Sequence, residues 1–150
     1  MSDRDLRPEL EALLLRAEQL LRTEEPWSGL GISADDVYRG WAGLVGRLEG
    51  RRWIHEEEYI HDIGLRDLLD EIIDVLRFDP EQHMVVNAVD EVDERFRTVT
   101  VRDDQLTLWD PAIRSAFQWW MRRLPREGEL AERIRRARRP RLPLRATNPG

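Results

Sequence analysis

The sequence predicts an all-α protein: a single-domain bundle of about four main helices, with short extra helices and an extended basic C-terminal tail. Apolar residues recur at three- and four-residue steps in several long stretches, which is the spacing of one helix face. Residues typical of helix ends bound most of these stretches. We expect the helical domain to cover residues 1–139, and an extended or disordered tail to cover residues 140–150.

Apolar stripes indicate the first two helices. Residues 6–24 place leucines and an alanine on one face, and Pro8 is compatible with this helix because it lies in the first turn. Ser33 and Asp36 have the spacing of a capping box, so a second helix begins after Ser33 and ends at Gly50. Three glycines on this helix indicate either close approach of another helix or a flexible helix that opens on binding: Gly40, Gly43 and Gly46.

Two further long helices follow. Residues 53–77 carry a strong apolar face, and Gly64 is expected to kink or split this helix. Asp79 and Pro80 start the next helix, with Asp79 as the N-cap and Pro80 at the first helical position. The apolar face of this helix has a heptad-like spacing and consists of Val85, Val89, Val92, Phe96 and Val99.

The C-terminal third of the chain has weaker patterns. Residues 98–109 contain two β-prone runs around a polar centre, which predicts a small hairpin or an irregular loop. The Asp110-Pro111 pair starts a short helix that is expected to end at Pro125. Residues 129–139 predict one more helix, which is basic and has a narrow apolar edge.

Composition excludes several classes of chemistry. The chain contains no cysteine, and all 24 basic residues are arginine. A thiol nucleophile, a Cys-ligated zinc site, a Schiff-base lysine and a P-loop lysine are therefore impossible. No apolar run approaches the ~18 residues that a membrane span requires, and the charged N-terminus lacks the pattern of a signal peptide. We expect a cytoplasmic protein that does not enter the membrane.

Charge is distributed unevenly along the chain. Residues 55–94 contain 14 acidic residues and two arginines, a net charge of −12, whereas residues 111–150 contain 11 arginines and three acidic residues, a net charge of +8. Such asymmetry is typical of an interaction surface or a basic tail. The basic arm could also pair with the acidic segment, within one chain or between the two chains of a homodimer.

The first functional hypothesis is a non-enzymatic protein-interaction module whose acidic helical surface docks a basic protein partner. Small acidic helical proteins that neutralise a toxin or nuclease, such as immunity proteins and antitoxins, share these gross features, as do regulatory proteins. The sequence predicts no bound cofactor and argues against an enzyme more than for one. The partner-binding candidates are Asp70, Glu71, Asp74, Glu91, Glu94 and the tryptophan Trp119.

Two alternatives remain open. The first is a nucleic-acid-associated protein whose arginine-rich arm contacts phosphates through Arg133, Arg135, Arg136, Arg138 and Arg139. The second is a metal-dependent enzyme, because the Glu-x-x-His spacing on one helix is that of a carboxylate and an imidazole sharing a metal. Its candidate ligands are Glu57, Glu58, His61, Glu71 and Asp74. No second Glu-x-x-His exists, and a solvated acidic face explains the same residues.

Overall fold

The computed structural model describes residues 3–24, 27–109 and 118–138, and it confirms the predicted all-α fold. The four long helices are α1 (Asp3–Leu21), α3 (Ala34–Glu49), α4 (Glu56–Val75) and α5 (Gln82–Val99). The shorter elements are α2 (Trp27–Leu30), β1 (Thr100–Arg102), the 3-10 helix η2 (Trp119–Arg122), β2 (Arg123–Pro125) and α6 (Glu129–Arg138). None of the helices in the described ranges is both long and apolar enough to cross a membrane.

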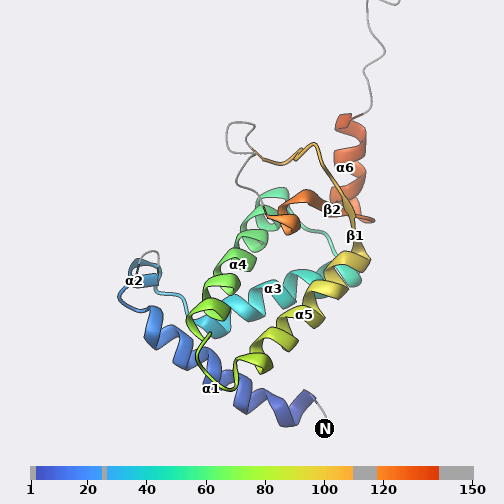
Figure 1. Cartoon of the computed structure of the whole chain (residues 1–150). Helices are drawn as coiled ribbons and strands as arrows, with labels where there is room; N and C mark the ends of the chain where they lie inside the picture. Colours follow the sequence, from blue (N-terminus) through green and yellow to red (C-terminus); the bar gives the residue numbers. More distant parts are fainter. Residues whose placement is uncertain (1–2, 25–26, 110–117, 139–150) are drawn as a thin grey trace, which may run out of the picture.

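Helix α3 is the centre of the bundle (Figure 1). It packs against α4 and α5, and α1 contacts all three at the end of the bundle away from the β1–β2 pair. Fully buried side chains from these four helices form one core, the largest being Trp41, Tyr59 and Phe96. The apolar face predicted for α5 lies in this core: Val85, Val89, Val92 and Phe96 are all buried.

The predicted ends of α3 are confirmed. The Ser33 hydroxyl accepts a hydrogen bond from the backbone N–H of Asp36 at 3.0 Å, and Gly50 is the C-cap. Of the three glycines on this helix, Gly40 alone meets another helix, since a Cβ there would clash with the Cδ1 of Leu65 in α4. A Cβ at Gly43 or Gly46 would have no neighbour within 4 Å. Close helix approach therefore explains one glycine and not the other two.

Two predicted features of α4 and α5 need correction. Helix α4 runs without a break through Gly64, because the i to i−4 hydrogen bonds continue on both sides of it. Helix α5 begins at Gln82 rather than at Pro80. The Asp79 carboxylate instead accepts a hydrogen bond from the backbone N–H of Glu81 at 2.9 Å, so it closes the turn that precedes the helix.

Of the two alternatives predicted for residues 98–109, the hairpin is wrong, and the irregular loop is confirmed for residues 103–109. Strand β1 pairs in antiparallel register with β2, with Val101 opposite Leu124. The chain turns after β1 because the buried Asp103 carboxylate accepts hydrogen bonds from the backbone N–H groups of Gln105 and Thr107, at 3.2 and 2.9 Å. The backbone groups that would form a hairpin are thus used in a turn around Asp103.

The prediction of a helix that ends at Pro125 is wrong for residues 119–125. Residues 119–122 form a 3-10 turn and residues 123–125 form β2, because backbone pairing with β1 competes with helical hydrogen bonds in this segment. The predicted helix start at Asp110 and Pro111 and the predicted tail, 140–150, lie outside the described residues.

Candidate functional site

A buried ion pair joins α4 to α5. The Nε and Nη2 atoms of Arg66 donate to the two carboxylate oxygens of Asp93, each at 2.9 Å, and the indole N–H of Trp41 donates to the same carboxylate at 3.1 Å. The side chains of Arg66 and Asp93 are 7% and 5% exposed. Burial alone would lower the pKa of Arg66, but its hydrogen bonds to Asp93 and Asp70 raise it, so the guanidinium stays charged.

Trp120 closes this cluster from the side of η2. The guanidinium of Arg66 lies 4.4 Å from the Trp120 ring centroid, and the indole N–H of Trp120 donates to Asp67 at 2.8 Å. Partial burial raises the pKa of Asp67; the hydrogen bond from Trp120 opposes this rise, and the charge of Asp70 adds to it. Four elements, α3, α4, α5 and η2, thus meet at one charged centre.

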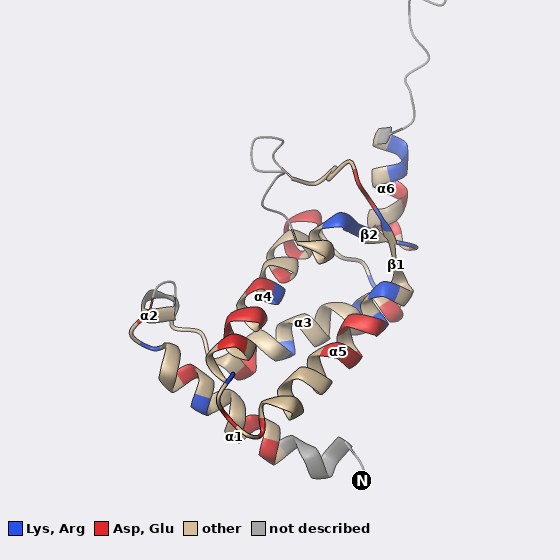
Figure 2. Cartoon of the chain, in the orientation of Figure 1, with Lys and Arg blue, Asp and Glu red and all other residues tan. Residues whose placement is uncertain are grey.

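The carboxylates on the outer side of α4 form an acidic stripe, which we define as Asp67, Asp70, Glu71 and Asp74. These positions follow one another at steps of three or four residues, so they lie along one side of the helix. Figure 2 shows Asp and Glu residues along much of α4. The side chains of Asp70 and Asp74 are 51% and 76% exposed. Glu71 accepts a hydrogen bond from the indole N–H of Trp27 at 3.3 Å, which anchors α2 to the stripe.

Of the other predicted partner-binding residues, Glu94 and Trp119 are linked through Arg97, whereas Glu91 lies apart. Glu94 pairs with Arg97, whose guanidinium lies 4.0 Å from the ring centroid of Trp119. Trp119 in turn packs edge-on against Trp120, with 5.6 Å between ring centroids. Glu91, two residues before Asp93, lies about 200° around α5 from it and so on the side away from α4.

The residues at the centre of this cluster were missed by sequence reasoning. Arg66 is the only arginine of α4, whose 20 residues carry eight carboxylates, and a lone arginine among carboxylates was the signal available in the sequence. A buried Asp beside the apolar stripe of α5 gives no such signal, since Asp93 is indistinguishable in sequence from its exposed neighbours.

The proposed metal ligands are not brought together. Arg47 of α3 bridges Glu58, at 3.1 Å, and Asp62, and the His61 ring lies against Asp62 at 3.1 Å. Glu71 and Asp74 lie about 20 Å or more farther along α4 than Glu58. Within the described residues, no group of three or more histidines or carboxylates is placed to hold a metal ion.

The predicted nucleic-acid-binding arginines are described only in part. Arg133, Arg135 and Arg136 are exposed on α6, and Arg135 pairs with Glu132 at 3.0 Å and donates to the backbone carbonyl of Arg126. Helix α6 extends through Arg138, and Arg139 lies outside the described residues. Arg133 lines a hollow of about 290 Å³ whose other walls come from the 107–108 turn, α6 and Glu56 of α4.

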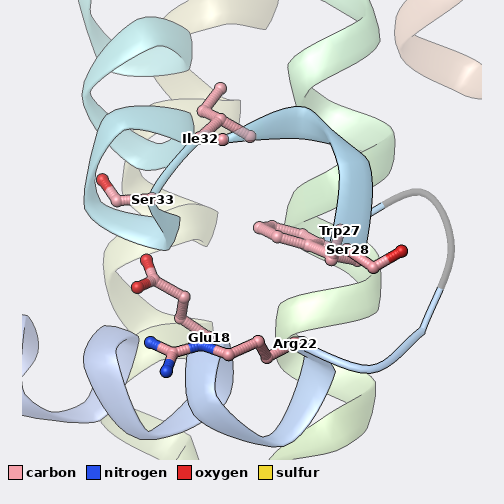
Figure 3. A pocket seen from close by; sticks show the side chains of 7 residues that line it. Glu18, Arg22, Trp27, Ser28, Ile32 and Ser33 are labelled. Atoms are coloured by element: carbon pink, nitrogen blue, oxygen red, sulfur yellow. The ribbon is translucent and has the colours of Figure 1, made fainter.

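A second hollow, of about 310 Å³, lies between α1, α2 and the start of α3 (Figure 3). Two of its polar side chains are already used in the fold. Glu18 accepts the backbone N–H of Ala34 at 2.7 Å, and the Ser33 hydroxyl caps α3. These two side chains satisfy backbone N–H groups at the N-terminus of α3.

Comparisons of the chain with protein-family models, curated proteins and solved structures found no match. The described residues form an all-α protein in which Asp and Glu residues follow α4 and arginines lie in β2 and α6 (Figure 2).

Proposed function

We propose that this chain is a non-enzymatic protein-interaction module whose acidic stripe docks a basic protein partner. The pairing of Arg66 with Asp93 carries the proposal. It directs the single arginine of α4 mainly to a carboxylate inside the protein, so that only Nη1 of Arg66 reaches the stripe, at Asp70. Arg77 pairs with Asp74, and the four carboxylates of the stripe still outnumber these two arginines. An excess of surface charge of one sign attracts an oppositely charged partner over a Debye length and favours correct orientation on encounter.

Phe78 supports the same surface with an apolar contact. It is 87% exposed in the turn after α4, and the guanidinium of Arg77 lies 4.9 Å from its ring centroid while also pairing with Asp74 at 3.4 Å. An exposed aromatic ring beside charged residues is typical of an interface, where it enters a partner pocket and excludes water. The stripe would supply the orientation and Phe78 the buried contact.

The test is a nuclease-treated pull-down from the native host, followed by affinity measurement with the isolated partner. The variant D70N/D74N removes two exposed charges and should weaken binding roughly tenfold, mainly through slower association. The control E9Q/E24Q removes two exposed carboxylates from α1 and the turn after it, and should bind as the wild type does. The proposal is wrong if both variants bind the isolated partner equally well, or if the partner is acidic.

F78A gives a second, independent readout. Removing a ring that is 87% exposed leaves the core unchanged, so thermal stability should stay within about 0.5 kcal/mol of the wild type. Binding should weaken through faster dissociation, by roughly tenfold or more. An unchanged dissociation rate would remove Phe78 from the interface while leaving the charge argument to be judged by the first pair of variants.

A further inference from the structure

A largely apolar hollow lies where α6 meets the 107–108 turn and the start of α4. It has a volume of about 290 Å³, and four of the seven residues that line it are apolar: Leu108, Leu130, Ile134 and Ala137. Ligand pockets begin at about 300 Å³, so this hollow is large enough to take one aromatic side chain. Glu56 and Arg133 also line it, and in the described part of the chain neither of them forms an ion pair.

The turn after α4 presents an exposed ring beside two opposite charges. Phe78 is 87% exposed, and next to it Arg77 and Asp74 form an ion pair of 3.4 Å whose side chains are 55% and 76% exposed. An exposed ion pair of this kind contributes little to stability, so its two members can exchange partners at little cost. We call these three residues, Asp74, Arg77 and Phe78, the Phe78 turn.

The Phe78 turn and the hollow are complementary in apolar surface and in charge. The ring matches the apolar lining, Asp74 matches Arg133 and Arg77 matches Glu56. The two surfaces cannot meet within one chain. Glu56 is the first residue of α4 and Phe78 follows its last residue by three, so the helix separates them by roughly 30 Å. Figure 1 accordingly shows α6 and the α4–α5 turn at opposite ends of the bundle.

We infer that the chain self-associates through this contact: Phe78 of one copy enters the hollow of a second copy, where Asp74 faces Arg133 and Arg77 faces Glu56. A two-fold dimer in which each copy fills the other's hollow contains the contact twice, whereas an open chain of copies contains it once per junction. The contact is small, so the association is weak and reversible. It uses Phe78 and Asp74, which the proposed function assigns to a basic partner, but it needs no such partner.

The test is sedimentation equilibrium of the full chain over a series of protein concentrations that reaches the millimolar range. F78A should weaken association roughly tenfold or more, because the ring supplies the apolar part of the contact. D74R and R133E should each weaken it roughly fivefold, because an exposed attraction becomes a repulsion. The double variant D74R/R133E should associate more tightly than either single variant, because every copy then carries the reversed pair.

The matched controls are E9R and R22E, which change the net charge as D74R and R133E do, at exposed positions on α1 and in the turn after it. Both should associate as the wild type does, and circular dichroism establishes that every variant is folded. A wild type that stays monomeric into the millimolar range overturns the inference and leaves the hollow to another partner. Unchanged association in F78A also overturns it, as does a double variant that associates no more tightly than both single variants.

These outcomes are distinct from those of the proposed function. Arg133 lies outside the acidic stripe, so R133E should alter self-association and leave the binding of a basic partner unchanged. A monomeric chain that still binds a basic partner through the stripe removes only the self-association. A chain that self-associates, but whose D70N/D74N variant binds the isolated partner normally, removes only the proposed function.

Discussion

Arg66 and Arg47, two of the arginines that each bridge two carboxylates, lie in opposite surroundings. Arg66 joins Asp93 and Asp70 between α4 and α5, with 7% of its side chain exposed. Arg47 joins Glu58 and Asp62 between α3 and α4, with 31% of its side chain exposed. The same groups are thus used once inside the bundle and once at its surface.

The two clusters differ in the free-energy cost of leaving one charged group without its partners. Inside the bundle, a lone guanidinium would be cut off from water, and so Asp93, Trp41 and Trp120 must all be in place around Arg66. At the surface, water replaces a lost partner of Arg47. The cluster around Arg66, the inner cluster, therefore favours one packing of the helices. The cluster around Arg47, the outer cluster, contributes little to the choice of packing.

The largest change in folding stability is expected on substitution of Asp93. D93A should lower the free energy of unfolding by about 3–5 kcal/mol, because it leaves Arg66 buried without its main counter-charge. Urea denaturation followed by tryptophan fluorescence measures this. A loss below about 1 kcal/mol would contradict the claim that losing a charged partner destabilises the inner cluster more than the outer one.

Tyr59 tests a neutral hydrogen bond in the same core. Its hydroxyl donates to the backbone carbonyl of Arg123 at 2.7 Å, and burial raises the pKa of Tyr59 well above its ordinary value of 10.0. Y59F should cost about 1 kcal/mol, because one neutral hydrogen bond is lost and the ring stays packed. In the wild type, tyrosinate absorbance from Tyr59 should not develop at alkaline pH until the protein unfolds; its appearance in the folded state would contradict this assignment.

A smaller effect is expected at Arg47. R47A should cost about 1 kcal/mol or less, since both of its ion pairs are partly solvated. The cost should shrink further in high salt, whereas that of D93A should not. Equal salt dependence of the two variants would show that exposure does not distinguish the clusters.

The smallest change in folding stability, and one in the stabilising direction, is expected on substitution of Asp67. The pKa of Asp67 in the folded protein is raised above the ordinary 3.8, mainly by burial. The protonated carboxyl therefore stabilises the fold fully below about pH 3.8, and this contribution is lost as the pH rises through the pKa that Asp67 has in the folded protein. D67N keeps an acceptor for Trp120 and should be as stable as the wild type or slightly more stable at neutral pH. Thermal melts between pH 3 and 7 should show the wild type losing stability relative to D67N as pH rises.

Local patterns predicted much of the helical framework, because neighbouring residues alone produce it. Ser33 and Gly50 mark the ends of α3, and the repeating valines and Phe96 mark the buried face of α5. The acidic character of α4 was equally visible in the sequence. The same local reasoning could not decide between a hairpin and an irregular loop for residues 98–109, and it did not predict that residues 100–102 pair with residues 123–125.

The sequence by itself determined the four long helices, the apolar side of each and where charged residues accumulate along the chain, since these follow from residues within a few positions of one another. Only the tertiary structure decided which charges remain on the surface. Arg66 and Asp93 are 27 residues apart in sequence, and Arg102 and Arg123 are separated by 21. Contacts at such separations depend on how the helices pack and on which polar groups are removed from water, and no local pattern contains that information.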